Sequence, residues 1–508
     1  MNLLKTASMI VVITLIGRLL GFVRTLYVSH LYGTGMEADA YFLALTIPMT
    51  LFMIIPGAIN AVMIPTMRGI LEENQTQKAS VLYHKMLALI TFSFFALTVA
   101  GYFLSPQIAL MYGVSGEKAA LTIRQLQLMW PSVFFIGLAG LWASVLNAHH
   151  HFFTSTLGTV ANSVIVILAM VALVPIVGVD GLSIATTLGY VAALVVMWPA
   201  MRKYGYSQRF NLQYRQDAEL RSMGERVVPI LIGSVISQTT TFLERGLTTG
   251  LGDGKVAALS YANQIAQLPM AIFVGAFTLP LFPLLANYVK RKEMHLMKAT
   301  LEKGLSYLLI LLFPVTIGFI LYGENLISLL FVRQSGAFNE EALSWTAFGL
   351  IFYGMGLYFL SARDWITRAF YALENTRTPV IVGVIGIGVY VLTAKLFTPL
   401  LEHGGVALSA SVSAMVQSIL LFLLLWRSIG QLLTWDFLLT VAKVLIACAV
   451  MSVVAFILRV LLLESGRLLD LLVGGTVSTV IYFTVLFILR EPLVKDIVGK
   501  IAGRFMKK

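Results

Sequence analysis

The sequence predicts an all-α polytopic membrane protein, and three observations carry this prediction. Of its 508 residues, 58% are hydrophobic and 12% are charged, whereas soluble proteins carry about 25% charged residues. Apolar runs recur along the chain, and many reach the roughly 20 residues that a helix needs to cross a bilayer. Arg18 and Arg24 nevertheless lie inside the first run, which indicates a polar, positive interior.

Apolar length predicts about fourteen transmembrane helices, numbered here as spans 1 to 14 in chain order. They cover residues 7–32, 38–67, 80–104, 124–148, 153–176, 179–201, 226–248, 255–287, 303–322, 341–362, 378–398, 404–429, 437–461 and 468–490. The first span is not expected to be a cleaved signal peptide, because it is too long and carries internal arginines.

The positive charges gather in alternate connections between spans. The connection after span 6 alone holds Arg202, Lys203, Arg209, Arg215 and Arg221, whereas the odd-numbered connections hold few cations, such as Lys118 and Lys255. The positive-inside rule therefore predicts that both termini lie in the cytoplasm. Because topology explains the net charge of +12, no nucleic-acid partner is expected.

A hydrophilic stretch at residues 202–225 divides the chain near its middle, and the two halves resemble each other at an offset near 218 residues. The matched positions are Gly33, Gly35, Ala40, Ala44, Gly57 and Pro65 with Gly252, Gly254, Ala258, Ala262, Gly275 and Pro283. Parallel repeats are typical of two-lobed alternating-access transporters. We expect an N-lobe (1–201), a cytoplasmic linker (202–225), a C-lobe (226–429), and a last part (430–508) with two helices and a basic tail.

The arginines of span 1 are the first candidates for binding an anionic substrate. A guanidinium keeps its charge and costs roughly 2.5–3.5 kcal/mol at the centre of a spanning helix. Arg18 and Arg24 are about 120° apart on a helix, so they can line one broad groove. Gly17 and Gly21 would let a ligand or another helix approach closely. The alternative is that Arg24 reaches the headgroups from a helix end.

Other polar residues of the spans have two interpretations each. Asp39 opens span 2, where it is either an N-cap or first-turn acid favoured by the helix dipole or a gate residue that pairs with an arginine of the other lobe. Glu244 and Arg245 lie near the end of span 7, either as a structural ion pair or, for Arg245, as the counterpart of Arg24. Asn263 and Gln264 add uncharged polarity to span 8 as candidate cavity-lining residues.

No catalytic or metal-binding motif is found in the sequence. Cys448 is the only cysteine, so a disulfide within one chain or a multi-cysteine metal site is impossible. His149, His150 and His151 lie between two apolar runs, where an interfacial loop is favoured over a metal site. Acids and nucleophiles do not cluster, and no phosphate loop occurs. These patterns favour a transporter without a cofactor over a membrane enzyme of envelope synthesis.

Three segments resemble a known family. Gly-Arg-Leu-Leu-Gly-Phe-Val-Arg (17–24), followed by residues 33–48, is similar to the opening of the MurJ/MviN family of bacterial lipid II flippases, in the multidrug/oligosaccharidyl-lipid/polysaccharide exporter superfamily. Residues 368–379 match a second family segment, and residues 257–263 match a third. The resemblance covers nearly the whole chain and includes the number of spans.

The resemblance implies two six-helix lobes around a cationic cavity, and two C-terminal helices that hold the undecaprenyl tail. By position, Arg18, Arg24 and Asp39 match functional residues of the family. Leu51 and Phe52 stand where some members carry an arginine, and Asn263 and Gln264 stand where some carry an acidic-basic pair. Arg245 is expected to supply the missing cation of the second lobe. The location that the resemblance implies is the bacterial cell membrane. The expected partners are lipid II or another polyprenyl-pyrophosphate-linked saccharide, membrane lipids, and envelope-synthesis or division proteins. Export of another lipid-linked glycan for capsule, teichoic acid or exopolysaccharide is the alternative.

Overall fold

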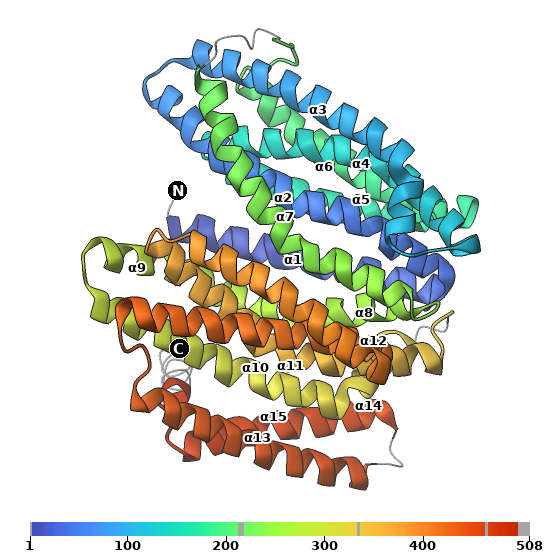
Figure 1. Cartoon of the computed structure of the whole chain (residues 1–508), viewed down its shortest axis with the longest axis vertical. Coiled ribbons are helices and arrows are strands. Elements are labelled where there is room, and N and C mark those ends of the chain that lie inside the picture. The colour runs from blue at the N-terminus through green and yellow to red at the C-terminus, as the bar shows by residue number, and fades with distance from the viewer. Residues whose placement is uncertain (1–2, 212–217, 333–335, 463–465, 496–508) are drawn as a thin grey trace, which may run out of the picture. The chain divides into compact units, whose positions relative to one another are not determined.

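The chain forms helices joined by short connections (Figure 1). The structure, a computed structural model, describes residues 3–211, 218–332, 336–462 and 466–495, and no strand occurs among them. The helices pack as two compact units, Met1–Ala257 and Ala258–Lys508. Each unit is described by itself.

The first unit contains the helices of the predicted N-lobe and the helix that follows them. These are α1 (Leu3–Tyr32), α2 (Met36–Glu72), α3 (Thr76–Met111), α4 (Gly116–Ala148), α5 (Phe152–Val177), α6 (Asp180–Lys203), α7 (Ala218–Thr249) and the start of α8 (Lys255–Pro269). Successive helices run in opposite directions, so their connections alternate between two ends. We call them the Asp39 end, with connections 33–35, 112–115 and 250–254, and the histidine end, with connections 73–75, 149–151 and 204–211.

The second unit contains the rest of α8 and the remaining helices. These are a π-helical turn η1 (Met270–Val274), α9 (Gly275–Lys290), α10 (Met294–Leu330), α11 (Glu340–Ala372), α12 (Arg377–Ile429), α13 (Trp435–Leu461), α14 (Arg467–Leu469), a second π-helical turn η4 (Asp470–Gly474) and α15 (Gly475–Ile488). The last four elements form the C-terminal hairpin.

The predicted all-α membrane class with about fourteen spans is confirmed. Eleven of the described helices are long and apolar enough to cross a bilayer by themselves. Predicted spans 11 and 12 share the long helix α12, which is interrupted by the non-helical backbone of Glu402 (φ 47°, ψ −129°). Spans 8 and 14 are each broken by a π-helical turn.

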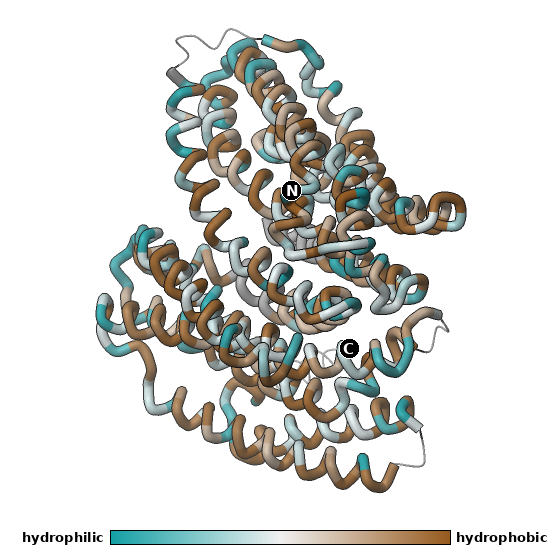
Figure 2. The backbone as a smooth tube through the Cα atoms, turned by 45° about the vertical axis from the view of Figure 1, so that its right-hand side comes forward, coloured by the Kyte–Doolittle hydropathy of each residue, from teal (hydrophilic) through white to brown (hydrophobic). Residues whose placement is uncertain are grey.

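Apolar side chains cover the outsides of the helices as well as their packed faces. Hydrophobic residues run along the helices, and hydrophilic residues collect towards the connections (Figure 2). On α3, for example, Phe92, Phe95 and Phe103 are 53%, 60% and 72% exposed. Such exposure would be costly in water, and it fits helices that are surrounded by lipid.

Each unit contains one point where a tryptophan ring packs directly on a glycine. A Cβ atom at Gly101 of α3 would overlap the ring of Trp130 of α4, and one at Gly304 of α10 would overlap the ring of Trp365 of α11. Both indole N–H groups donate within the same contact, to Ser105 Oγ at 3.1 Å and to the Leu301 carbonyl at 3.0 Å. These contacts fix how closely each helix pair approaches.

Candidate functional site

The predicted arginines of span 1 lie on α1. Arg18 is exposed and Arg24 is half-buried. A Cβ atom added at Gly17 or Gly21 would have no contact within 4 Å apart from its own helix. The described residues therefore leave the α1 surface around these glycines uncovered, so no helix packs closely there and a ligand has room.

Arg24 lies nearer the packed side of α1 than Arg18 does. Thr25 and Val28, which follow Arg24 within about one helical turn, are buried with 4% and 0% of their surface exposed. Arg18 lies on the part of α1 that the described residues leave exposed.

The predicted pair on α7 lies near the Asp39 end. Glu244 is buried and Arg245 is half-buried. The Arg245 guanidinium donates from Nη1 to the carbonyl oxygen of Val256 at 3.4 Å, and Thr248 Oγ1 donates to the Glu244 carbonyl at 2.7 Å. Arg245 therefore contacts the first turn of α8, at the same end as Asp39.

Asn263 and Gln264 belong to the second unit, where both are half-buried on α8. Asn263 Oδ1 accepts a hydrogen bond of 2.6 Å from Gln267 Nε2, one helical turn further along. These side chains supply uncharged polar groups, as the sequence predicts.

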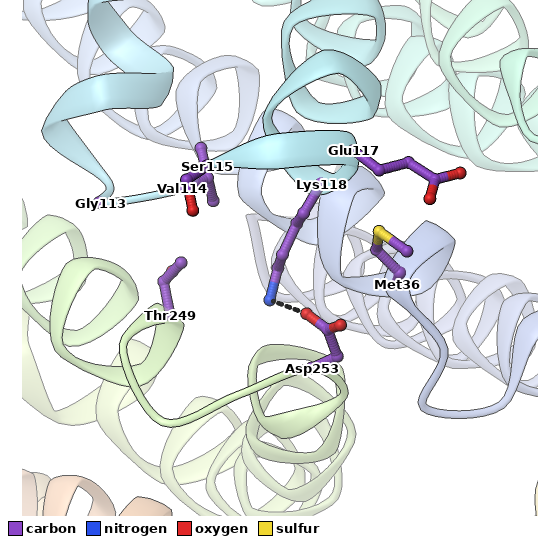
Figure 3. A pocket seen from close by; sticks show the side chains of 8 residues that line it. All are labelled: Met36, Gly113, Val114, Ser115, Glu117, Lys118, Thr249 and Asp253. Atoms are coloured by element: carbon purple, nitrogen blue, oxygen red, sulfur yellow. Dashed lines mark ion pairs between the residues drawn. The ribbon is translucent and has the colours of Figure 1, made fainter.

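Asp39 is the centre of a buried cluster at the Asp39 end, and Figure 3 shows two other members of this cluster, Lys118 and Asp253. Its carboxylate is fully buried, and Oδ2 accepts hydrogen bonds from Lys118 Nζ at 2.6 Å and from the Gly254 backbone N–H at 2.8 Å. Oδ1 accepts a bond of 2.7 Å from the Ala257 backbone N–H. Lys118 Nζ also lies 3.2 Å from Asp253 Oδ1. We call these residues the Asp39 cluster.

The predictions for Asp39 need one correction. Asp39 does lie in the first turn of α2, but it caps the start of α8 instead of its own helix. Its cation is not an arginine of the other lobe but Lys118 of α4, within the N-lobe sequence.

Local backbone geometry brings α8 to Asp39. The connection 250–254 turns through Gly252 and Gly254, whose φ angles of 104° and 85° only glycine adopts readily. The first N–H groups of a helix have no partner within it. Asp39 accepts from one of them, that of Ala257, and from the N–H of Gly254 directly before the helix. Asp39 and Ala257 are also 218 residues apart, which is the offset of the sequence repeat.

A cavity of about 320 Å³ lies above the Asp39 cluster. Its lining residues come from four parts of the first unit, and they are Met36, Gly113, Val114, Ser115, Glu117, Lys118, Thr249 and Asp253 (Figure 3). The Lys118 side chain is 9% exposed and that of Asp253 is 60% exposed. Solvent therefore reaches the edge of the cluster but not the Asp39 carboxylate.

At the histidine end, the start of the predicted linker is fastened to the first unit. His149 Nε2 and Tyr206 Oη are 2.8 Å apart, and the His149 ring stacks on Tyr204 at 4.2 Å. Burial raises the pKa of Tyr206 to about 12, so its hydroxyl keeps its proton. Burial, together with the neighbouring His150 and His151, lowers the pKa of His149. The three histidines form a connection, as predicted.

The described residues contain no group of three histidine, cysteine, aspartate or glutamate side chains that could hold a metal ion. Cys448 is buried and unbonded to another cysteine.

Sequence reasoning missed Lys118 and Asp253. Lys118 was counted only as a cation of the third connection, although the structure places it in the first turn of α4 with 7% exposure. A signal was present, because Lys118 and Asp253 are charged residues in connections that otherwise hold few charges. Their pairing spans 135 positions of sequence, so spacing alone could not connect them.

Comparisons with known proteins agree on one family. A family model described as lipid II flippase MurJ matches residues 28–475. A probable lipid II flippase MurJ of Rhizobium tropici is 26% identical over 466 residues, which are 89% of this chain and 86% of the relative. The lipid II flippase MurJ of Burkholderia cenocepacia is 25% identical over 433 residues, covering 83% of this chain and 84% of the relative.

Solved structures share the fold. A structure described as lipid II flippase MurJ in an inward closed conformation has a TM-score of 0.79 and 20% identity, and the match covers 96% of this chain and 99% of that chain. An inward-facing multidrug transporter of the MATE family, from the MOP superfamily, has a TM-score of 0.67 and 15% identity, covering 82% of this chain and 94% of that chain.

Proposed function

Since the chain belongs to the lipid II flippase MurJ family, we propose that it moves lipid II from the inner to the outer leaflet of the cell membrane by alternating access. The family match confirms the resemblance found in residues 17–24 and 33–48, and it agrees with a transporter and not an enzyme. The observation that carries the proposal is the combination of this match with two arginines, Arg18 and Arg24, on a helix whose surface is uncovered at Gly17 and Gly21.

The proposed substrate-binding residues are Arg18, Arg24 and Arg245. Lipid II carries its saccharide on a pyrophosphate, and a guanidinium can donate two parallel hydrogen bonds to such a group. Support comes from the exposure of Arg18 and from the open space at Gly17 and Gly21. Because Arg245 already contacts the Val256 carbonyl, it would bind substrate only when the first turn of α8 moves.

The proposed outer gate is the Asp39 cluster, with Glu244 as structural support on α7. The histidine end carries several cations where α6 ends and the next connection begins, including Arg202, Lys203 and Arg209. The positive-inside rule assigns such an end to the cytoplasm. The Asp39 end then faces outward. The proposed domains remain the N-lobe 1–201, the linker 202–225, the C-lobe 226–429 and the C-terminal part 430–508.

Complementation tests the transport function. The chain is expressed in a bacterium depleted of its own lipid II flippase, and growth is expected to recover. Arg18→Ala and Arg24→Ala should abolish rescue at normal abundance, whereas the lysine variants should recover part of it, because lysine lacks the planar fork. Full rescue by both lysine variants would contradict pyrophosphate binding by these residues.

A reconstituted assay separates the two substrate classes. Purified protein in liposomes should move labelled lipid II between leaflets without a change in its mass. If the inserted protein moved only another polyprenyl-linked glycan, the lipid II proposal would be wrong and export of that glycan would replace it. A chemically altered product would indicate an enzyme.

Cysteine labelling tests the orientation. Glu117→Cys at the Asp39 end and Ser207→Cys at the histidine end are placed in a Cys448→Ala background, and both positions are exposed. An impermeant thiol reagent should label the first variant in intact spheroplasts and the second only after permeabilisation. The reverse pattern would overturn the assignment of the outer gate.

A further inference from the structure

A second buried acid, in the C-terminal hairpin of the second unit, is left without a cation. At one end of the hairpin, Glu491 is 1% exposed and pairs with Lys443 at 3.1 Å. At the other end, Asp470 is 6% exposed, and among the described residues no lysine, arginine or histidine nitrogen lies within 4.0 Å of its carboxylate. Burying a charge without a partner is unfavourable. The lack of a cation at Asp470, in contrast to Glu491, therefore needs a physical explanation.

The carboxylate of Asp470 has one neutral partner and one unsatisfied oxygen. Asn325 Nδ2 of α10 donates to Oδ2 at 2.6 Å. Oδ1 has almost no exposed surface and no hydrogen-bond partner among the described residues. An unsatisfied buried oxygen of this kind commonly marks the place of a water molecule or an ion.

Nearby arginines are engaged elsewhere. Arg467 makes two bonds to Glu340, at 2.9 and 3.0 Å. Arg459 donates to the Leu321 carbonyl at 3.0 Å and lies 3.8 Å from Glu324. Neither guanidinium bonds to Asp470.

Tyr322 Oη lies near the unsatisfied oxygen across Gly474, and Ser478 Oγ lies beside Tyr322 Oη. Tyr322 Oη of α10 and Ser478 Oγ of α15 are 3.3 Å apart, and both residues are buried. A Cβ atom on Gly474 would lie 2.7 Å from Tyr322 Oη and 3.1 Å from Asp470 Oδ1. The absence of a side chain at Gly474 therefore leaves these two oxygens facing one small space. Asp470 and Gly474 bound the π-helical turn η4, and such turns often occur at functional sites.

We propose that Asp470, Tyr322 and Ser478 bind a small monovalent cation of the Na⁺ class, which joins the C-terminal hairpin to α10. Oxygen ligands suit hard cations. A single carboxylate balances a single positive charge. Among the described residues, no second acid is hydrogen-bonded to Asp470, Tyr322 or Ser478. The cation would supply the charge that Lys443 supplies to Glu491 at the opposite end of the hairpin.

Hydrogen–deuterium exchange of the full-length purified protein tests this site and also locates it. Amide exchange is measured in sodium chloride and in choline chloride at equal ionic strength. Na⁺ should slow amide exchange in peptides that cover 469–475 and 322–325. Asp470→Asn should weaken this Na⁺ effect by at least about tenfold in apparent Kd, because it removes the only charged ligand. Glu491→Gln is the matched control, since it removes a buried acid of the same hairpin and should keep the effect.

Further variants keep the test decisive if Asp470→Asn does not fold. Ser478→Ala removes one hydroxyl ligand, and Gly474→Ala crowds the site while it leaves the carboxylate in place; both should weaken the Na⁺ effect. If Na⁺ gave the wild type no protection in 469–475, or if protection there survived Asp470→Asn, the proposal would be wrong. Equal loss of the effect in Glu491→Gln would also overturn it, because it would show a general weakening of the hairpin.

Discussion

The two ends of α7 are held to the rest of the first unit in different ways. At the Asp39 end, α7 leads into a connection whose N–H groups bond a carboxylate with 0% exposure. At the histidine end, Glu219 of α7 pairs with Lys78 of α3 at 2.5 Å, with side chains 36% and 50% exposed. A pocket of about 360 Å³ adjoins this exposed pair.

This difference indicates which end of α7 is costly to open. Removing one partner of a buried ion pair costs about 3–5 kcal/mol, because the other charge remains buried. An exposed ion pair contributes about 0–1 kcal/mol, since water replaces it readily. For an alternating-access transporter, the Asp39 end should therefore be the closed end of this structure and the histidine end the one that separates easily.

The largest effect is expected for Asp39→Ala, which leaves Lys118 and two backbone N–H groups without their acceptor. The free energy of unfolding should fall by about 3–5 kcal/mol, and rescue in the complementation assay should be lost. Asp39→Asn is the control, because its amide oxygen can still accept from the start of α8. Thermal unfolding should rank wild type above Asn and Asn above Ala; equal losses for both variants would contradict a role in capping α8.

A large effect on opening is expected for Lys118→Met, which removes the cation but keeps an apolar chain of similar length. A shift of about 2 kcal/mol would raise the open fraction roughly 30-fold. Thr249→Cys, at a buried position of the cavity lining, should report this shift as faster thiol labelling in a Cys448→Ala background. Adding Asp39→Asn to Lys118→Met should restore part of the closure, because no unpaired charge then remains.

A small effect is expected at the other end of α7. Lys78→Ala should change the free energy of unfolding by less than about 1 kcal/mol, because its ion pair is exposed. Growth in the complementation assay should be unchanged. If Lys78→Ala destabilised the protein by about 2 kcal/mol, the shift expected for Lys118→Met, the two ends of α7 would not differ in strength.

The smallest effect is expected from pH at the histidine end. Because the pKa of His149 is lowered in the folded protein, the fold favours the neutral ring. The resulting stabilisation is present above the unfolded value near 6.5 and is lost as the pH falls from there through the folded value. Exchange of amides in 204–211, corrected for intrinsic pH dependence, should therefore accelerate on acidification. The acceleration should be absent in His149→Asn, and its persistence there would point to another group.

The sequence predicted the architecture because apolar length is a local signal. All fourteen predicted spans fall on described helices, although Glu402 was not recognised as a kink within α12. Arg18, Arg24 and Asp39 could be singled out from the sequence because they are charged residues within or at the start of apolar spans. The partners of Asp39 were not, because Lys118 and Ala257 are 79 and 218 residues away. Asp470 passed unnoticed, since an acid near a span end looks ordinary until its burial is known.

The packing of Trp130 on Gly101 and of Trp365 on Gly304 has a consequence for how this protein can change over generations. Replacing either glycine forces the indole out of its place, while shrinking either tryptophan leaves a void, and a large-to-small change of this kind costs about 3–5 kcal/mol. Replacing the glycine by a larger residue and the tryptophan by a smaller one would preserve the packed volume. Substitutions arise one at a time, however, and either one alone destabilises the protein. These pairs should therefore be inherited together, while the lipid-facing residues around them drift.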